Sequence, residues 1–189
     1  GVMTREYLAG SPIRVLASGP AGGVIGSAAI GAAKGAKDLL CVDMGGTSYD
    51  VSIVNNGRTR LVTEGTVDGL PVRLPMIEIR TIGSGGGSIA SLEESGRLRV
   101  GPESAGAKPG PVCYRRGGTE PTVTDANFVL GRIDPDYFLG GAMSLDADGA
   151  KKAILERVAN PLMLSVEEAA EGILRIAVSR MAGAIRLSL

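Results

Sequence analysis

Two acidic residues and the glycine-rich stretch between them are the strongest candidates for a catalytic or binding site in this sequence. Asp43 ends an apolar run, and Asp50 begins a second run that is rich in β-branched residues. The intervening residues include two glycines and two hydroxyl side chains (DMGGTSYD, 43–50). This pattern predicts a strand, a tight turn and a return strand. The turn would then present several backbone N–H groups at one end of a sheet.

The turn itself has the composition of a phosphate site. A concave set of backbone N–H dipoles binds an anion such as phosphate. Gly45 and Gly46 would let the phosphate approach the backbone, and Thr47 and Ser48 would add hydroxyl donors. We therefore predict that Gly45, Gly46, Thr47 and Ser48 bind a phosphorylated cofactor.

The two carboxylates would repel a bare phosphate, so their presence needs an explanation. Mg²⁺ is commonly bound by one or two carboxylates together with substrate phosphates and waters. Asp43 and Asp50 are therefore predicted to be catalytic residues and metal ligands for a Mg²⁺-nucleotide. The alternative is a purely structural hairpin with an Asx-type turn.

The composition argues against several other functions. The chain has 189 residues with 20 basic and 20 acidic side chains, no His and no Trp. The lack of His excludes a His-based triad and His metal ligands within this chain. The zero net charge and the 3% aromatic content give no indication of a nucleic-acid partner. We also expect no membrane partner, because no apolar run is long enough to span a bilayer. The lack of a recognisable signal peptide and of a disulfide framework favours the cytoplasm.

Strands and a helix must position the turn. Residues 38–44 predict a buried strand, 50–55 a return strand, and Asn-Asn-Gly at 55–57 a hairpin turn. The alternating residues 58–67 predict a third strand, which gives phosphate-loop strands over about 38–66. Short strands are also expected at 12–17 and 75–82, with a hairpin around 94–97.

Helices are expected on either side of these strands in the chain. Residues 18–35 predict a helix built almost wholly of small residues. Its glycines cost about 1 kcal/mol each relative to Ala, which indicates close packing against a ligand or, equally, against another helix. Ser165 and Glu168 form a capping box that begins a terminal helix at 165–189. The chain ends inside this helix, so we expect a fragment of a longer protein.

The segment between strands and helices contains further candidates. Gly85 and Gly86, in the glycine run 83–88, are predicted to contact the cofactor, and a tight turn is the alternative. The loop 101–121 is long enough to be functional or mobile. Asp125 is a candidate catalytic carboxylate, although the N-cap of a short helix is the favoured interpretation. The basic pair at 115–116 favours a solvated surface over an anion site, and Cys113 has no recognisable activating neighbour.

These motifs resemble those of a known superfamily and, within it, a known family. DMGGTSYDVSIV resembles the second phosphate loop of the actin, sugar-kinase and heat-shock chaperone ATPases. SGPAGGVIGSAAIGAAKG resembles the small-residue helix before that loop, which implies that residues 18–35 link two lobes. TIGSGGGSIA, VGPESAGAKPGPVCYRRGG and TVTDANFVLGRID resemble the hydantoinase A and 5-oxoprolinase family. The resemblance implies an α/β fold, a ribonuclease-H-like lobe with a mixed sheet and flanking helices. Tyr49 and Ser84 differ from the Thr and Ala common in the family.

The resemblance also implies a function. Family members use ATP to phosphorylate a cyclic amide of the hydantoin or 5-oxoproline type, whose ring then opens. Asp43 and Asp50 would manage Mg²⁺ and the attacking oxygen, and Gly45, Gly46 and Thr47 would hold phosphate oxygens. The alternatives are a subunit of an ATP-dependent ketone carboxylase and a non-enzymatic actin-like ATP switch. The loops at 83–88 and 101–121 favour an enzyme.

The expected partners follow from the same resemblance. They are a small-molecule cyclic amide or ketone and a second hydantoinase-type subunit, and homo-oligomers are plausible. Residues 1–189 alone are expected to be inactive, since the family's first phosphate loop and adenosine-binding segment lie elsewhere.

Overall fold

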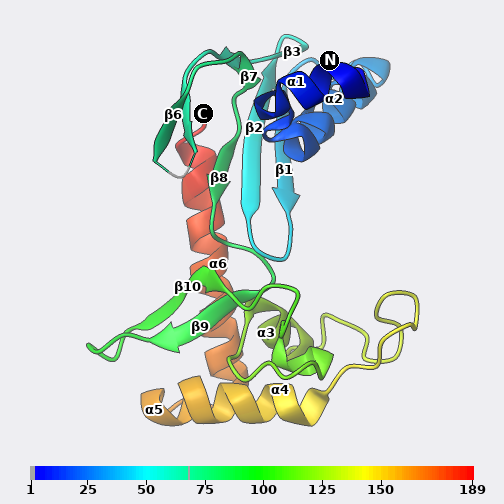
Figure 1. Cartoon of the computed structure of the whole chain (residues 1–189). Coiled ribbons are helices and arrows are strands. Elements are labelled where there is room, and N and C mark those ends of the chain that lie inside the picture. The colour runs from blue at the N-terminus through cyan, green and yellow to red at the C-terminus, as the bar shows by residue number, and fades with distance from the viewer. Residues whose placement is uncertain (1–2, 68) are drawn as a thin grey trace. The chain divides into compact units, whose positions relative to one another are not determined.

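The computed structural model describes residues 3–67 and 69–189, which form two compact units (Figure 1). The first unit comprises residues 1–43, 50–80 and 188–189, and the second comprises 44–49 and 81–187. The two units are described separately.

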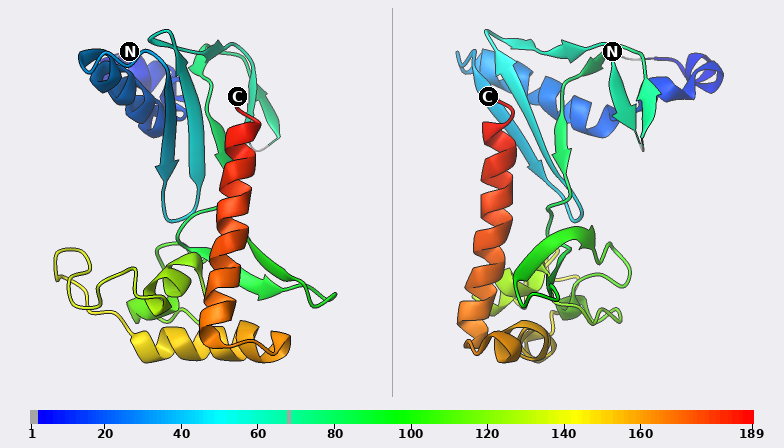
Figure 2. Two further views of the ribbon diagram at one scale, coloured as in Figure 1. Left: turned by 180° about the vertical axis from the view of Figure 1, so that it is seen from behind. Right: turned by 90° about the vertical axis from the view of Figure 1, so that its left-hand side faces the viewer.

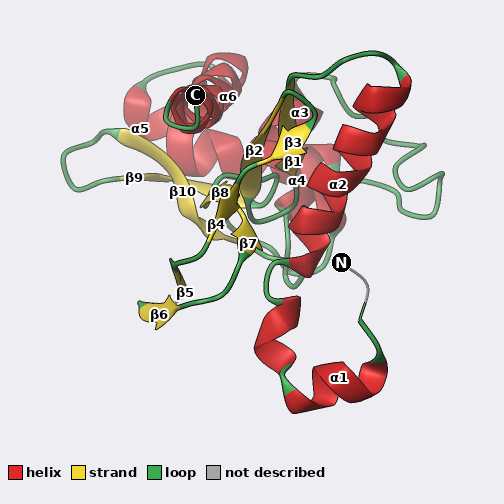
Figure 3. Ribbon diagram, turned by 90° about the horizontal axis from the view of Figure 1, so that it is seen from above, coloured by secondary structure: helices red, strands yellow, loops and turns green. Residues whose placement is uncertain are grey.

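The first unit begins with helices and continues with short strands. Its helices are α1 (Arg5–Gly10), the 3₁₀ helix η1 (Pro12–Val15) and α2 (Ser18–Ala33). Its sheet has the order β1 (Leu39–Met44), β2 (Tyr49–Asn55) and β3 (Arg58–Thr59), and β8 (Arg80–Ile82) also pairs with β2. Two small antiparallel pairs consist of β4 (Leu61–Val62) with β7 (Met76–Ile77) and β5 (Gly65–Val67) with β6 (Leu70–Val72). Helix α2 lies beside the β1–β2 hairpin (Figures 1 and 3), whereas α1 stands apart from the strands, as the view in Figure 3 shows.

The turn from β2 to β3 confirms the hairpin expected from the sequence. Asn55 pairs with Arg58, so the loop consists of Asn56 and Gly57. These two residues have φ values of 50° and 73°. Positive φ at both loop positions defines the type I′ turn that Asn-Gly favours.

Three of the expected strands differ from the structure. Residues 12–15 form η1, with Pro12 in its first turn, because proline fixes φ and lacks the N–H that a strand ladder needs. The expected third strand at 58–67 is divided among β3, β4 and β5, which pair with three different strands. The segment 75–82 is likewise divided into β7 and β8.

Strand β1 is also less buried than its apolar sequence predicts. Leu40, Val42 and Met44 alternate along the strand and expose 46%, 52% and 46% of their surface. Since side chains two residues apart share a face, one face of β1 presents a continuous apolar row.

The second unit contains a hairpin and a cluster of helices. Its strands β9 (Ser88–Leu92) and β10 (Leu98–Ser104) are antiparallel, as the expected hairpin requires. The 3₁₀ helix η2 (Val112–Tyr114) and α3 (Val123–Val129) follow, so the segment 101–121 is partly ordered structure. Helix α4 (Ala147–Ile154) continues through the π-helical turn η3 (Leu155–Ala159) into α5 (Asn160–Leu162). The chain then forms the long helix α6 (Val166–Arg186), seen at full length in Figure 2.

The core of the second unit forms where α6 meets β10, α3 and α4. Ile154, Val158 and Ile173 are fully buried there. Ser165 caps α6 by accepting from the Glu168 N–H, and the Glu168 carboxylate accepts from the Ser165 N–H, which confirms the predicted capping box. Among the described residues, no helix is both long and apolar enough to cross a membrane.

Candidate nucleotide-phosphate site

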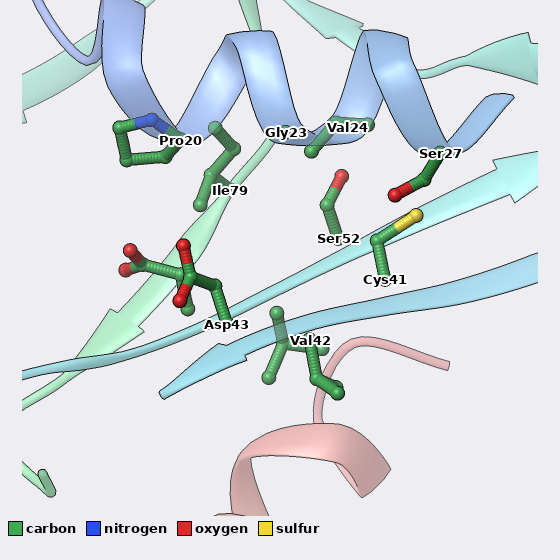
Figure 4. A pocket seen from close by; sticks show the side chains of 11 residues that line it. Pro20, Gly23, Val24, Ser27, Cys41, Val42, Asp43, Ser52 and Ile79 are labelled. Carbon is green, nitrogen blue, oxygen red and sulfur yellow. The ribbon is translucent and has the colours of Figure 1, made fainter. Parts of the chain in front are cut away.

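The first unit holds a pocket between α2 and the β1–β2 hairpin, with a volume of about 140 Å³ (Figure 4). Asp43 from β1 and Asp50 from β2 both line it, as do Cys41 and Ser52 one alternation further along each strand. The α2 residues that line it are Pro20, Gly23, Val24 and Ser27, and the remaining lining residues are Val42, Val51 and Ile79. The two carboxylates predicted to act together therefore share one pocket.

The carboxylates differ in exposure, and they do not form a complete metal cage. Asp43 is exposed and Asp50 is half-buried. Among the residues that the structure describes, no three His, Cys, Asp or Glu side chains lie close enough together to hold a metal ion. Two carboxylates nevertheless fit Mg²⁺, because this ion keeps several waters and takes further oxygens from substrate phosphates.

The turn between the two carboxylates belongs to the second unit. The Gly45 N–H donates to the Ser48 carbonyl at 3.0 Å, which closes the turn. No described residue accepts a hydrogen bond from the N–H groups of Gly46, Thr47 or Ser48. A Cβ atom added at Gly46 would meet nothing within 4 Å. The turn therefore has unused donors and an open side, as an anion site requires.

The glycine run 83–88 lies against this turn, backbone to backbone. The Gly86 N–H donates to the Gly45 carbonyl at 3.0 Å, and the Gly87 N–H donates to the Gly46 carbonyl at 2.6 Å. A Cβ atom added at Gly85 would lie 2.7 Å from backbone atoms of Gly45, Gly46 and Thr47. Only glycine allows so close an approach.

These contacts bear on the predicted role of Gly85 and Gly86. The Gly85 N–H donates to Ser88 Oγ at 2.9 Å, and the Gly86 N–H is used by Gly45. Both N–H groups are therefore engaged inside the protein, which favours the tight-turn alternative. Direct cofactor binding by Gly85 and Gly86 stays a prediction.

A further layer holds the glycine run in place. The Gly86 carbonyl accepts from the Thr124 N–H at 2.8 Å and from Thr124 Oγ1 at 2.9 Å. The Gly87 carbonyl accepts from the Ala105 N–H at 2.8 Å. Ser104, next to Ala105, places its Oγ 3.3 Å from Thr47 Oγ1. Sequence reasoning missed Ser104, because no spacing rule connects positions that lie 57 residues apart.

Asp125 is fully buried, and its carboxylate is occupied by protein donors. Oδ1 accepts from the Cys113 N–H at 2.8 Å, and Oδ2 accepts from Val112 N at 3.2 Å, Thr122 N at 2.9 Å and Thr122 Oγ1 at 2.8 Å. The N-cap interpretation was wrong, because Thr122 is the N-cap of α3 and Asp125 is the third residue of the helix, which completes the capping box. The contacts favour a structural role, and catalysis by Asp125 stays a prediction.

The thiol of Cys113, whose N–H is bonded to Asp125, is not reactive. Burial, and then the Asp125 charge, raises the pKa of the Cys113 thiol far above its usual range.

Arg115 is exposed and in the left-handed conformation, with its Nε 3.9 Å from Asp146 Oδ2. Exposed pairs of this kind contribute little to stability.

The two residues that differ from the family pattern are both buried. Tyr49 exposes 7% and Ser84 exposes 1% of its surface. The Ser84 Oγ has no hydrogen-bond partner among the described residues. Neither side chain is on the open side of the turn.

A hairpin turn with unused N–H groups, flanked by paired carboxylates and preceded by a small-residue helix, defines the chain as part of an ATPase-type α/β protein. The family model for hydantoinase/oxoprolinase matches residues 1–189, and the chain belongs to this family.

Relatives with assigned activities support this assignment. The chain is 42% identical over 186 residues to caprolactamase subunit alpha of Pseudomonas jessenii. The aligned region covers 98% of this chain and 26% of the relative. It is 47% identical over 175 residues to the acetophenone carboxylase gamma subunit of Aromatoleum aromaticum. This aligned region covers 92% of the chain and 24% of the relative.

A solved structure agrees. The nucleotide-free structure of acetone carboxylase, an enzyme of ATP-dependent acetone carboxylation, matches 89% of this chain and 24% of its own, with a TM-score of 0.84 and 37% identity. This likeness confirms the expected α/β lobe of the ribonuclease-H-like ATPase type. The chain spans about a quarter of the length of these relatives.

Proposed function

We propose that residues 1–189 form part of an enzyme that uses ATP to activate the carbonyl group of a cyclic amide for ring opening. The observation that carries the proposal is the turn with unused N–H groups between two carboxylates that line one pocket. Only Met44 separates Asp43 from Gly45, so chain connectivity keeps the acidic residues and the turn close together.

In the proposed chemistry, the N–H groups of the turn and the two carboxylates have different roles. The amide oxygen takes the γ-phosphoryl group and ADP leaves. Water then adds to the activated carbon, and the C–N bond breaks as the nitrogen takes a proton, which leaves an acyl phosphate. A second water hydrolyses the acyl phosphate to a carboxylate and free phosphate. Phosphoryl transfer depends mainly on positioning and on neutralising charge. The N–H groups of Gly46, Thr47 and Ser48 would hold phosphate oxygens.

Asp43 and Asp50 would hold Mg²⁺, which neutralises phosphate charge when it is bound. Asp50 is the more buried of the two and would also orient the attacking oxygen. This assignment needs no His, which the chain lacks.

A second candidate is the activation of a ketone for carboxylation, in which the same phosphoryl transfer precedes addition of a one-carbon unit. The 47% identity to an acetophenone carboxylase subunit favours keeping it. Caprolactamase alpha and the carboxylase gamma chain are both named as subunits, which supports a second subunit as the partner. A non-enzymatic ATP switch has no support among these relatives.

The test is the substitution Asp43→Asn in the full-length protein with its partner subunit. Loss of the charge should lower ATP turnover by about a hundredfold or more, because electrostatic stabilisation is the main catalytic effect in phosphoryl transfer. Asp136→Asn, at an exposed loop carboxylate, is the matched control. Unchanged ATP turnover in a folded Asp43→Asn protein would contradict the proposal.

A further inference from the structure

Ser104 connects the turn to a second loop through its hydroxyl group. It ends β10, where it pairs with Ser88 of β9. Its Oγ accepts from the Gly106 N–H at 3.1 Å and lies 3.3 Å from Thr47 Oγ1. The Ala105 N–H, one residue further on, is bound to the Gly87 carbonyl at 2.8 Å. The position of Ser104 relative to the turn is therefore fixed by backbone hydrogen bonds on both sides.

We propose that Ser104 is a positioning residue that orients the hydroxyl group of Thr47 toward a phosphate oxygen of ATP. The inference rests on the proposed function, in which the Gly45–Ser48 turn binds the phosphates. Ser104 itself does not contact the phosphate in this arrangement. It acts on the nucleotide only through Thr47.

The hydrogen-bonding capacity of Ser104 allows it to be the donor to Thr47. A serine hydroxyl has one hydrogen and accepts through its lone pairs. Since Ser104 Oγ already accepts from Gly106, its hydrogen is free to be donated to Thr47 Oγ1. Thr47 Oγ1 then serves as the acceptor, and its own hydrogen is left for an outside acceptor.

A bound anion selects the same direction. In the opposite arrangement Thr47 would donate to Ser104, and its lone pairs would face the phosphate, which is unfavourable. The 3.3 Å separation is longer than the usual hydroxyl–hydroxyl distance of about 2.8 Å. Ser104 therefore orients Thr47 while leaving its hydroxyl free to align with a phosphate oxygen.

The experiment compares Ser104→Ala with Ser104→Thr in the full-length protein with its partner subunit, by steady-state ATP turnover. Ser104→Ala should raise KM for ATP by up to about tenfold, the usual range for losing one hydrogen bond between neutral groups. The kcat value should change little, because the bond is made in both ground and transition states. Ser104→Thr keeps a hydroxyl and should restore KM. Ser144→Ala, at an exposed serine before α4, is the matched control.

A double-mutant cycle with Thr47→Val tests whether the effect passes through Thr47. In the Thr47→Val background, Ser104→Ala should have no further effect on KM. Equal effects in both backgrounds, or a lower melting temperature of the nucleotide-free protein that accounts for the loss, would overturn the inference. If Thr47→Val raises KM and Ser104→Ala does not, the inference fails and the proposed function stands. If neither variant changes KM, nucleotide binding at this turn is itself wrong.

Discussion

At the scale of single residues, the two cysteines show how surroundings set reactivity. Cys113 is fully buried, and burial together with the Asp125 carboxylate raises the pKa of its thiol. A raised pKa keeps the thiol protonated and unreactive. Because the folded state favours the protonated thiol, the contribution of this group to the free energy of unfolding is present below the unfolded pKa and is lost as pH rises. Cys41 is half-buried and lines the pocket between α2 and the hairpin.

We therefore expect iodoacetamide at pH 8 to alkylate Cys41 and to leave Cys113 unmodified in the folded protein. Peptide mass spectrometry measures the extent at each site, and a urea-unfolded sample, in which both sites should react, is the control. Modification of Cys113 at a rate similar to that of Cys41 would show that the loop around η2 opens readily.

Some of the residue-level features of the candidate site could be predicted from the sequence, and others could not. The shared face of Asp43 and Asp50 could be predicted, because strand alternation and a short turn leave few arrangements. The N-cap interpretation of Asp125 was wrong, although the sequence contains the correct pattern. Thr122 followed three residues later by an acid fits the capping-box pattern. The further donors to Asp125, the N–H groups of Val112 and Cys113 in η2, come from a segment whose position no local pattern predicts.

At the scale of elements, the glycines of the turn and of its backing segment should respond differently to alanine. Gly85→Ala would place a Cβ atom 2.7 Å from backbone atoms of Gly45, Gly46 and Thr47, so the turn must shift. We expect a loss of about 1–3 kcal/mol of stability, as for other overpacking substitutions, together with weaker ATP binding.

Gly46→Ala is the matched comparison, because its Cβ atom would meet nothing within 4 Å. This variant should unfold at nearly the wild-type temperature and still bind ATP more weakly, since the methyl group lies where the phosphate approaches. Thermal unfolding and nucleotide titration separate the two effects. Equal melting temperatures for both variants would contradict the backbone packing described here.

The elements that could be predicted are those governed by neighbouring residues. The Asn56-Gly57 turn and the capping box at Ser165 both follow from local hydrogen-bonding chemistry. The strand expected at 58–67 failed because β3, β4 and β5 each pair with a different strand. The exposure of β1 was missed for a related reason, since an apolar run does not say what covers it.

At the scale of the whole molecule, residues 1–189 span only about a quarter of the related proteins. We expect the isolated chain to fold but to bind Mg-ATP weakly or not at all, and to hydrolyse no hydantoin or 5-oxoproline. A few N–H contacts to a hydrated triphosphate yield little affinity. The exposed apolar row of Leu40, Val42 and Met44 also favours self-association.

Calorimetric titration of the isolated chain with Mg-ATP tests this expectation, and the full-length protein is the positive control. Micromolar binding by residues 1–189 alone would show that the chain contains a more complete nucleotide site than we propose.

The backbone contact between the turn and the glycine run also has a consequence for the order of folding. The β1–β2 hairpin depends on neighbouring residues and can close in about 1–10 μs. Its turn is held by the Gly86 and Gly87 N–H groups, and that segment is in turn held by Thr124 of α3. Contacts between such distant positions form late, because a long loop must close first. In a newly synthesised chain, both carboxylates should therefore be in place well before the turn can bind a phosphate. The ability to bind the nucleotide should appear only at the end of folding.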